Sequence, residues 1–440
     1  MQKGGHRRNL ALTLAANFGI LGFTVVTGTL NARILGPSGR GELAAIQTIP
    51  SFLGMLALLG LPSAVGYFSA RRPGEARAFT LLGVGLCLLA SIPFILVGYG
   101  LLPWALQEQP SHVIGEARLY LAFIVLQSLV LPPHMALQGL GKFKLWNVLR
   151  MAPNFAALGA IALSFFSGNP SAGKFASSYL LLYAALAPLT YVALLSRAKP
   201  HASNQPTSVR AKELLRYGLP SALMIPAGLL NLQLDQMLMA AWLPSRVLGL
   251  YAVSVSWSGL LSPAFSALGS IVFPTLAAAH DRAAQRSLVG RSFRLAVILV
   301  ILLGIGLALV TPLLIPLFFG KAFGPAVPTA LLLVLAGMVL SLNNLSGEIL
   351  RGLGAPRWPL FSQLAGLPVT VILLVVLLPR WSLVGAAVAS LASYLVAGFV
   401  CIVGIRRTCD LSTRELLVPG RSDGLMILSA ARGVLVRFER

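Results

Sequence analysis

The sequence predicts an all-α, polytopic membrane protein with twelve transmembrane helices in two six-helix, pseudo-symmetric lobes. Composition is the first observation behind this prediction. Hydrophobic residues make up 57% of the 440 residues and charged residues only 10%, whereas a soluble domain carries about 25% charged residues. The mean hydropathy of +0.83 agrees. A soluble enzyme, a disordered chain and a secreted disulfide scaffold are therefore all excluded.

The second observation is the distribution of uncharged stretches. Each uncharged stretch is long enough to cross a bilayer core as a helix, which takes about 20 apolar residues. They are also too long for strands and lack the alternation of a membrane barrel. In order, the twelve predicted spans are 9–32, 43–70, 78–107, 119–141, 151–173, 175–196, 217–245 (interrupted only by Asp235), 247–279, 295–320, 322–347, 358–379 and 381–405.

The third observation is the placement of the basic residues along the chain. Their excess over the acidic residues gives the net charge of +22. With the N-terminus inside and the first span uncleaved, 27 of the 34 Lys and Arg residues fall on the cytoplasmic side, as the positive-inside rule requires. The seven on the outer side are Arg33, Arg40, Arg118, Lys174, Arg246, Lys321 and Arg380. Both termini are therefore expected in the cytoplasm. The inner charge is spread over seven segments, which argues against nucleic-acid binding and favours contact with anionic membrane lipids.

An internal repeat predicts the two lobes. The sequence LQGLG at 137–141 ends the fourth predicted span, and LRGLG at 350–354 ends the tenth. A weaker similarity relates 35–38 to 243–245 after the first and seventh spans. Six helices per repeat return the chain to its starting side, so the repeats would be parallel. The predicted organisation is an N-terminal lobe (1–197), a cytoplasmic linker (198–212), a C-terminal lobe (213–405) and a basic cytoplasmic tail (406–440) that can hold an interfacial helix from Gly424.

The segment between the first two spans, ARILGPSGRGELA at 32–44, resembles the first-loop signature of bacterial polysaccharide-biosynthesis membrane proteins. LLGLP at 58–62 and the LQGLG turn are also similar to that family. This family contains the O-antigen and exopolysaccharide flippases of the multidrug/oligosaccharidyl-lipid/polysaccharide exporter superfamily. The resemblance implies two lobes around a partly polar central cavity in the bacterial inner membrane. It further implies transfer of an undecaprenyl-diphosphate-linked oligosaccharide to the outer leaflet, with a polysaccharide polymerase and glycosyltransferases as candidate partners.

Two alternatives remain open. A cation-coupled multidrug exporter of the same superfamily often has an acidic residue in its first helix, and 9–32 has none. A membrane glycan polymerase or ligase would normally need a large outer loop, and the predicted loops are short. No catalytic set and no GxxxxGK[ST] phosphate loop is present, so we expect a transporter and not an enzyme. The three Cys and five His are scattered, so no metal site or cofactor is predicted.

Ionisable residues within spans are costly and are functional candidates by default. Asp235 lies in the seventh span, with Asn231 one turn earlier on the same helix face. This pair could form a cation or proton site or contact sugar hydroxyls. The alternative is a carboxylate that reaches the outer interface or is paired within the bundle.

Glu348 lies near the inner end of the tenth span, with Arg351 three residues later and within ion-pair reach. The two residues could form a structural pair that closes the helix end. They could instead belong to a cytoplasmic gate or receive the headgroup.

Arg33 ends the first span and could hold a lipid diphosphate, since a guanidinium matches phosphate oxygens, or could serve as an interfacial anchor. Asn17 on the first span and Gln127 and His134 on the fourth form polar stripes. Such stripes suit a cavity that receives sugars, but interhelical hydrogen bonds explain them equally well.

Overall fold

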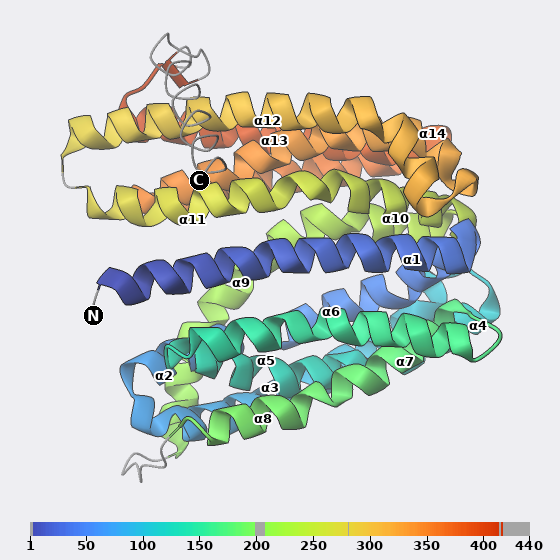
Figure 1. Ribbon diagram of the computed structural model, residues 1–440, viewed down its shortest axis with the longest axis horizontal. Helices are drawn as coiled ribbons and strands as arrows, with labels where there is room; N and C mark the ends of the chain where they lie inside the picture. Colours follow the sequence, from blue (N-terminus) through green and yellow to red (C-terminus); the bar gives the residue numbers. More distant parts are fainter. Residues whose placement is uncertain (1–2, 199–206, 280, 413–414, 417–440) are drawn as a thin grey trace, which may run out of the picture. The chain divides into compact units, whose positions relative to one another are not determined.

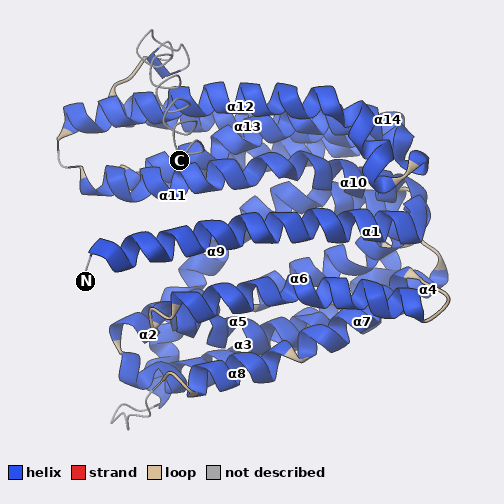
Figure 2. Cartoon of the chain, in the orientation of Figure 1, coloured by secondary structure: helices blue, strands red, loops and turns tan. Residues whose placement is uncertain are grey.

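The computed structural model describes residues 3–198, 207–279, 281–412 and 415–416. Within these ranges every regular element is a helix (Figure 2). The α-helices, labelled in Figure 1, are α1 (Lys3–Ala57), α2 (Leu61–Arg71), α3 (Ala76–Ala105), α4 (Ser111–Tyr120), α5 (Ala122–Gly139), α6 (Phe143–Phe166), α7 (Ala172–Ala184), α8 (Leu186–Leu195), α9 (Thr207–Trp242), α10 (Ser245–Ser258), α11 (Ser262–Ala278), α12 (Arg282–Phe319), α13 (Val327–Gly352) and α14 (Arg357–Cys409). Short 3₁₀ helices cover Pro73–Glu75, Gly259–Leu261 and Lys321–Ala326.

The two longest elements, α1 and α14, each contain one residue with non-helical backbone angles. In α1 this residue is Gly36, at φ 66° and ψ −177°. Glycine reaches this conformation readily, and the following Pro37 suits the first position of a new helix. In α14 the residue is Ser382, at φ 48° and ψ −123°. Each element is therefore two helices joined at a sharp kink, which lies between two predicted spans at Gly36 and just inside the twelfth predicted span at Ser382.

Nine candidate spans among the described residues have the length and composition to cross a membrane. Some combine adjoining elements, such as Ser111–Gly139, which joins α4 and α5, and Ser245–Ala277, which joins α10 and α11. Division of α1 and α14 at their kinks, together with the long helix α9, makes the architecture compatible with twelve spans. The prediction of an all-α polytopic membrane protein is confirmed.

The chain packs as two compact units. Unit 1 comprises residues 1–256, 315–326 and 377–383. Unit 2 comprises the remaining segments, 257–314, 327–376 and 384–440. Each unit has a core of Leu, Val, Phe and Ala side chains. In unit 1 this core joins α2, α3, α5 and α9, and in unit 2 it joins α11, α12, α13 and α14.

Many large apolar side chains point outward. Leu89 and Leu96 of α3 and Leu309 and Leu313 of α12 are each more than 60% exposed. Such a surface would be a liability in water and suits contact with lipid. The predicted linker lies largely at 199–206, and the predicted interfacial helix lies in 417–440, both outside the described residues. α9 already begins at Thr207.

Candidate functional site

Unit 1 contains a cavity of about 360 Å³. It is lined from α1 on both sides of the Gly36 kink, and from α4, α5, α6, α7 and α10. The volume lies near the lower end of the range of about 300–1,000 Å³ that is typical of small-molecule sites. Its polar and aromatic lining residues are Thr24, Thr27, Asn31, Arg40, Gln47, Ser51, Tyr120, Phe123, Asn154, Phe175, Tyr179 and Ser256.

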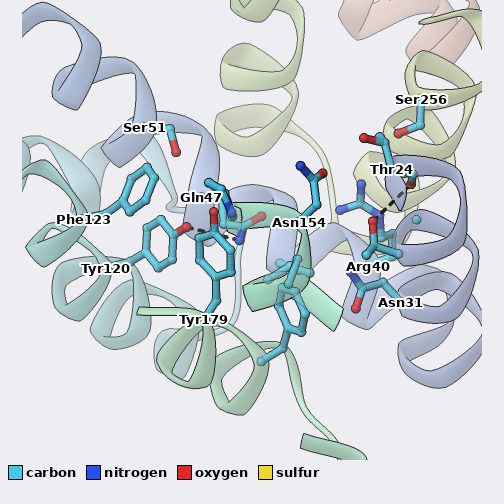
Figure 3. A pocket seen from close by; sticks show the side chains of 16 residues that line it. Thr24, Asn31, Arg40, Gln47, Ser51, Tyr120, Phe123, Asn154, Tyr179 and Ser256 are labelled. Carbon is cyan, nitrogen blue, oxygen red and sulfur yellow. Dashed lines mark hydrogen bonds between the residues drawn. The ribbon is translucent and has the colours of Figure 1, made fainter. Parts of the chain in front are cut away.

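One end of the cavity is basic and polar. Figure 3 shows Arg40, Asn31, Thr24 and Ser256 at this end. The Nε atom of Arg40 is buried and has no hydrogen-bond partner among the described residues. The Thr24 hydroxyl donates to the carbonyl of Ile20 on its own helix, at 2.8 Å. A buried guanidinium nitrogen without an acceptor is costly, so this end of the cavity favours an anionic or hydroxyl-bearing occupant.

The other end of the cavity is aromatic. Figure 3 places Tyr120, Phe123 and Tyr179 there, together with Gln47 and Ser51. The rings of Tyr120 and Phe123 stack with centroids 5.3 Å apart, and the Phe123 and Tyr179 centroids lie 6.0 Å apart. The Gln47 side-chain amide donates to the Tyr120 hydroxyl at 3.3 Å. This end therefore offers aromatic surface together with an amide and hydroxyl groups.

The aromatic residues and the amides Gln47 and Asn154 of this lining are not recognisable as site residues from the sequence. Tyr120, Tyr179 and Phe123 lie in apolar spans, where a buried aromatic ring ordinarily belongs to the core. Gln47 and Asn154 are single amides whose helix faces could not be assigned without tertiary contacts. The sequence places Arg40 in the first outer loop, whereas in the structure it lies on α1 and lines the cavity.

Asp235 and Asn231 are both buried on α9, each with 4% exposure. The Tyr251 hydroxyl of α10 donates to Asp235 Oδ2 at 2.5 Å, and the backbone amide of Gln236 donates to Oδ1 at 2.7 Å. Neither Asp235 nor Asn231 is among the residues that line the cavity. The structure thus places the carboxylate at a hydrogen-bonded contact between α9 and α10.

Glu348 and Arg351 lie together on α13 in unit 2. Arg351 Nη2 donates to Glu348 Oε1 at 2.6 Å, which forms the ion pair that the spacing predicts. Glu348 also packs against α11, because a Cβ at Gly269 would lie 2.8 Å from its Cγ.

Arg33 is exposed and caps a helix end. Its Nε donates to the Phe318 carbonyl at 2.6 Å, and its Nη2 donates to the Leu317 carbonyl, both in the last turn of α12. Carbonyl groups in the last turn of a helix lack partners within the helix and carry partial negative charge, so a guanidinium stabilises them.

Asn17 and His134 belong to one polar-aromatic group on α1, α5 and α6. Arg150 donates to Asn17 Oδ1, and its guanidinium lies 5.2 Å from the centre of the Trp146 ring. The His134 ring stacks on the same indole at 5.8 Å, and its Nε2 lies 2.9 Å from the Trp146 carbonyl. Gln127 is apart from this group. Its buried Oε1 has no hydrogen-bond partner among the described residues. None of these residues is assigned to the cavity lining.

The comparisons with known proteins place the chain in a family. The sequence profile of the polysaccharide biosynthesis protein family matches residues 30–328. The chain belongs to this family. The resemblance carried by residues 32–44 is therefore confirmed. The protein is a multi-pass membrane member of a family named for polysaccharide biosynthesis.

One curated relative is similar to this chain along most of the length of both proteins. It is the probable low-salt glycan biosynthesis flippase Agl15 of Haloferax volcanii, 23% identical over 406 residues, with 89% of this chain and 81% of the relative covered.

Solved transporter structures share the fold. The lipid II flippase MurJ in an inward closed conformation matches with a TM-score of 0.74 at 13% identity, with 90% of this chain and 87% of that chain covered. The MATE multidrug transporter DinF-BH matches with a TM-score of 0.65 at 15% identity, over 94% and 98% of the two chains. The family member therefore has the fold of these membrane transporters.

Proposed function

We propose that this protein is a flippase. It moves an oligosaccharide linked to undecaprenyl diphosphate from the cytoplasmic to the outer leaflet of a bacterial inner membrane, with both termini in the cytoplasm. It works by alternating access between the two predicted six-helix lobes and acts as a transporter, not as an enzyme. Family membership and the similarity to the probable glycan biosynthesis flippase of Haloferax volcanii support this proposal.

The cavity in unit 1 is the observation that carries the proposal. A lipid-linked sugar presents oxyanions and hydroxyl groups. Arg40 supplies a guanidinium, which matches phosphate oxygens in a planar, two-pronged contact. Gln47 and Asn154 supply amides that both donate and accept, as sugar hydroxyls require. The volume suits a small headgroup, so the remaining sugars and the lipid would extend beyond the cavity.

The residues predicted from the sequence take supporting roles in this proposal. Asp235, with Asn231, is the candidate for coupling to a cation or proton, because the chain has no phosphate loop for nucleotide binding. Glu348 and Arg351 are candidates for a cytoplasmic gate, and Arg33 for holding the diphosphate after transfer.

Asn17, Gln127 and His134 remain proposed as polar contacts along the route. A polysaccharide polymerase and glycosyltransferases are the proposed partners of the flippase in glycan assembly.

Purified protein in proteoliposomes tests the proposal directly. A fluorescent undecaprenyl-diphosphate sugar is incorporated, and its appearance in the opposite leaflet is followed by a membrane-impermeant quencher. We expect transfer above that of empty liposomes. Arg40→Ala should slow it about tenfold or more, since a hydrogen bond to a charged group contributes about 1.5–3 kcal/mol.

Arg118→Ala is the matched control for Arg40→Ala. Arg118 lies 4.1 Å from the centre of the Tyr99 ring and is not among the cavity-lining residues. We expect this variant to keep the transfer rate. If the liposomes move a cationic dye against a proton or sodium gradient and leave the lipid-linked sugar in place, the protein is a multidrug exporter and the proposal is wrong.

A further inference from the structure

Two helices of unit 1 cross with their backbones in direct contact. The crossing joins residues 37–41 of α1, just after the Gly36 kink, to residues 245–249 at the start of α10. A Cβ at Gly41 would overlap the Ser245 carbonyl oxygen and lie 2.9 Å from the Gly249 nitrogen. Real Cβ atoms essentially never approach other atoms this closely, so only glycine permits the contact.

The contact is reciprocal. A Cβ at Gly249 would overlap the Pro37 carbonyl oxygen and lie 2.8 Å from the Gly41 nitrogen. Residue 37 therefore corresponds to residue 245, and residue 41 to residue 249. The two corresponding pairs are separated by the same number of residues along the chain. Reciprocal contacts of this kind mark a two-fold axis. Gly41 and Ala44 also match Gly249 and Ala252, in the region where the sequence suggests a repeat.

The α10 side of the crossing is held in place by Gln109, which is buried with 6% exposure. Its amide donates to the carbonyls of Ala240 and Leu243 at 2.8 and 2.9 Å, and its Oε1 accepts from the Ser245 hydroxyl at 2.7 Å. The turn between α9 and α10 is thus fixed at the point where α1 crosses it.

The cavity begins at this crossing. Arg40 belongs to the crossing segment and lines the cavity, and Leu43 and Gln47 continue the wall along α1. On the other helix, Ser256 lies further along α10 and also lines the cavity. Both crossing helices therefore run directly from their contact into the cavity walls. The predicted topology places the Gly36 kink and the α9–α10 turn at the outer face.

We propose that the Gly41–Gly249 crossing is the outer gate of the cavity, a backbone-to-backbone seal on this local two-fold axis that must part before a carried molecule leaves. This inference rests on the proposed function in its direction of release. The absence of both side chains allows a close seal and leaves no interlocking groups to be pulled apart. A methyl group at either position would hold the helices apart and bias the gate towards the open state.

Cysteine accessibility tests the gate without any transport substrate. Cys87, Cys401 and Cys409 are replaced by Ser, and Ser256→Cys supplies a single thiol in the cavity wall. A membrane-impermeant thiol reagent is added from the outer face, and labelling is normalised to the amount of folded protein. Gly41→Ala and Gly249→Ala should each raise the labelling rate about tenfold or more, given the usual cost of overpacking. Addition from the opposite face should give no such rise.

Gly22→Ala is the matched control, because it lies on α1 and a Cβ there meets nothing within 4 Å. Its labelling should equal that of the parent. Gln109→Ala should also raise the labelling rate, because it frees the α9–α10 turn without adding an atom. This variant decides the outcome if the glycine variants do not fold.

Labelling of folded Gly41→Ala and Gly249→Ala at the control rate would overturn the gate. So would a rise in only one of the two, because a reciprocal contact requires the same effect from both. If the glycine variants do not fold, an unchanged rate in Gln109→Ala overturns it. Because the thiol reagent reports opening alone, failure of the lipid-linked sugar assay would refute the proposed function and with it the direction of release, whereas the gate itself would be refuted only by the labelling results.

Discussion

The hydrogen bond between Tyr251 and Asp235 gives a prediction with a calculable size. The Tyr251 hydroxyl lies 2.5 Å from Asp235 Oδ2, and the two residues are 0% and 4% exposed. Tyr251→Phe removes the donor and little else. Asp235→Asn keeps the shape of the side chain and removes its charge.

The expected magnitude follows from the burial of both groups. A hydrogen bond to a charged partner contributes about 1.5–3 kcal/mol, about twice a neutral one. Tyr251→Phe also leaves one carboxylate oxygen with reduced solvation, which adds to the loss. Asp235 keeps the bond from the Gln236 amide. We therefore expect Tyr251→Phe to destabilise the protein by about 2 kcal/mol.

A double-mutant cycle measures the part of the interaction that depends on the carboxylate charge, because the amide oxygen introduced by Asp235→Asn can still accept from the Tyr251 hydroxyl. The parent, Tyr251→Phe, Asp235→Asn and the double variant are unfolded in detergent, and their free energies of unfolding are compared. We expect a coupling energy of about 1–2 kcal/mol. Tyr67→Phe is the control for a tyrosine hydroxyl elsewhere in unit 1, and it should not couple to Asp235→Asn. A Tyr251–Asp235 coupling below about 0.5 kcal/mol would refute the reasoning, since distant sites already add within that margin.

The same variants separate structure from transport at Asp235. If Asp235 couples transport to a cation, Asp235→Asn should abolish the dependence of transfer on the ion gradient, even at temperatures where the variant is fully folded. Tyr251→Phe should keep that dependence. Gradient-driven transfer in folded Asp235→Asn would assign the carboxylate to structure alone.

Three further predictions concern other contacts. Arg72, the residue after α2, has its Nη2 2.8 Å from Oε2 of Glu213 on α9, in a partly exposed ion pair. Arg72→Glu and Glu213→Arg should each lower the thermal midpoint. The double variant should recover part of the lost stability, about 0.5–1 kcal/mol. An absence of recovery would show that the ion pair contributes nothing to stability. Ser382 has φ 48° and ψ −123°, a sparsely populated combination that costs a non-glycine residue about 1–3 kcal/mol. Ser382→Gly should therefore raise the midpoint in a thermal melt, and a fall would mean that the hydroxyl is needed there. Glu415 accepts a hydrogen bond from the Ser412 amide at 2.7 Å, which holds the pKa of the Glu415 carboxyl below its usual value. Because the folded pKa is the lower one, this stabilisation is present above the ordinary glutamate pKa and is lost as the pH falls through the folded value. Melts of the parent against Glu415→Gln should converge at acid pH, and a constant difference would contradict the assignment.

Residues that break a chemical pattern could be recognised from the sequence, whereas cavity residues could not. Asp235 is recognisable because a charge in an apolar span is conspicuous, and the structure shows it buried against Tyr251. Tyr120 is buried and Tyr179 partly buried, both in predicted apolar spans, and only their position around a void distinguishes them from core aromatics. Periodicity identifies a buried helix face but does not specify what covers it, because a neighbouring helix and a cavity both favour the same side chains.

That the chain lies in lipid and that its regular elements are helices follows from the amino-acid sequence. Long uncharged runs can satisfy their backbone in lipid only as helices, so composition and charge placement lead to an all-α membrane protein without any knowledge of packing. Tertiary structure alone decided which helices meet and what they enclose. The crossing of Gly41 with Gly249 and the cavity that begins beneath it depend on contacts between segments about 200 residues apart. Such contacts arise from shape complementarity between whole helices, which no local pattern of residues encodes.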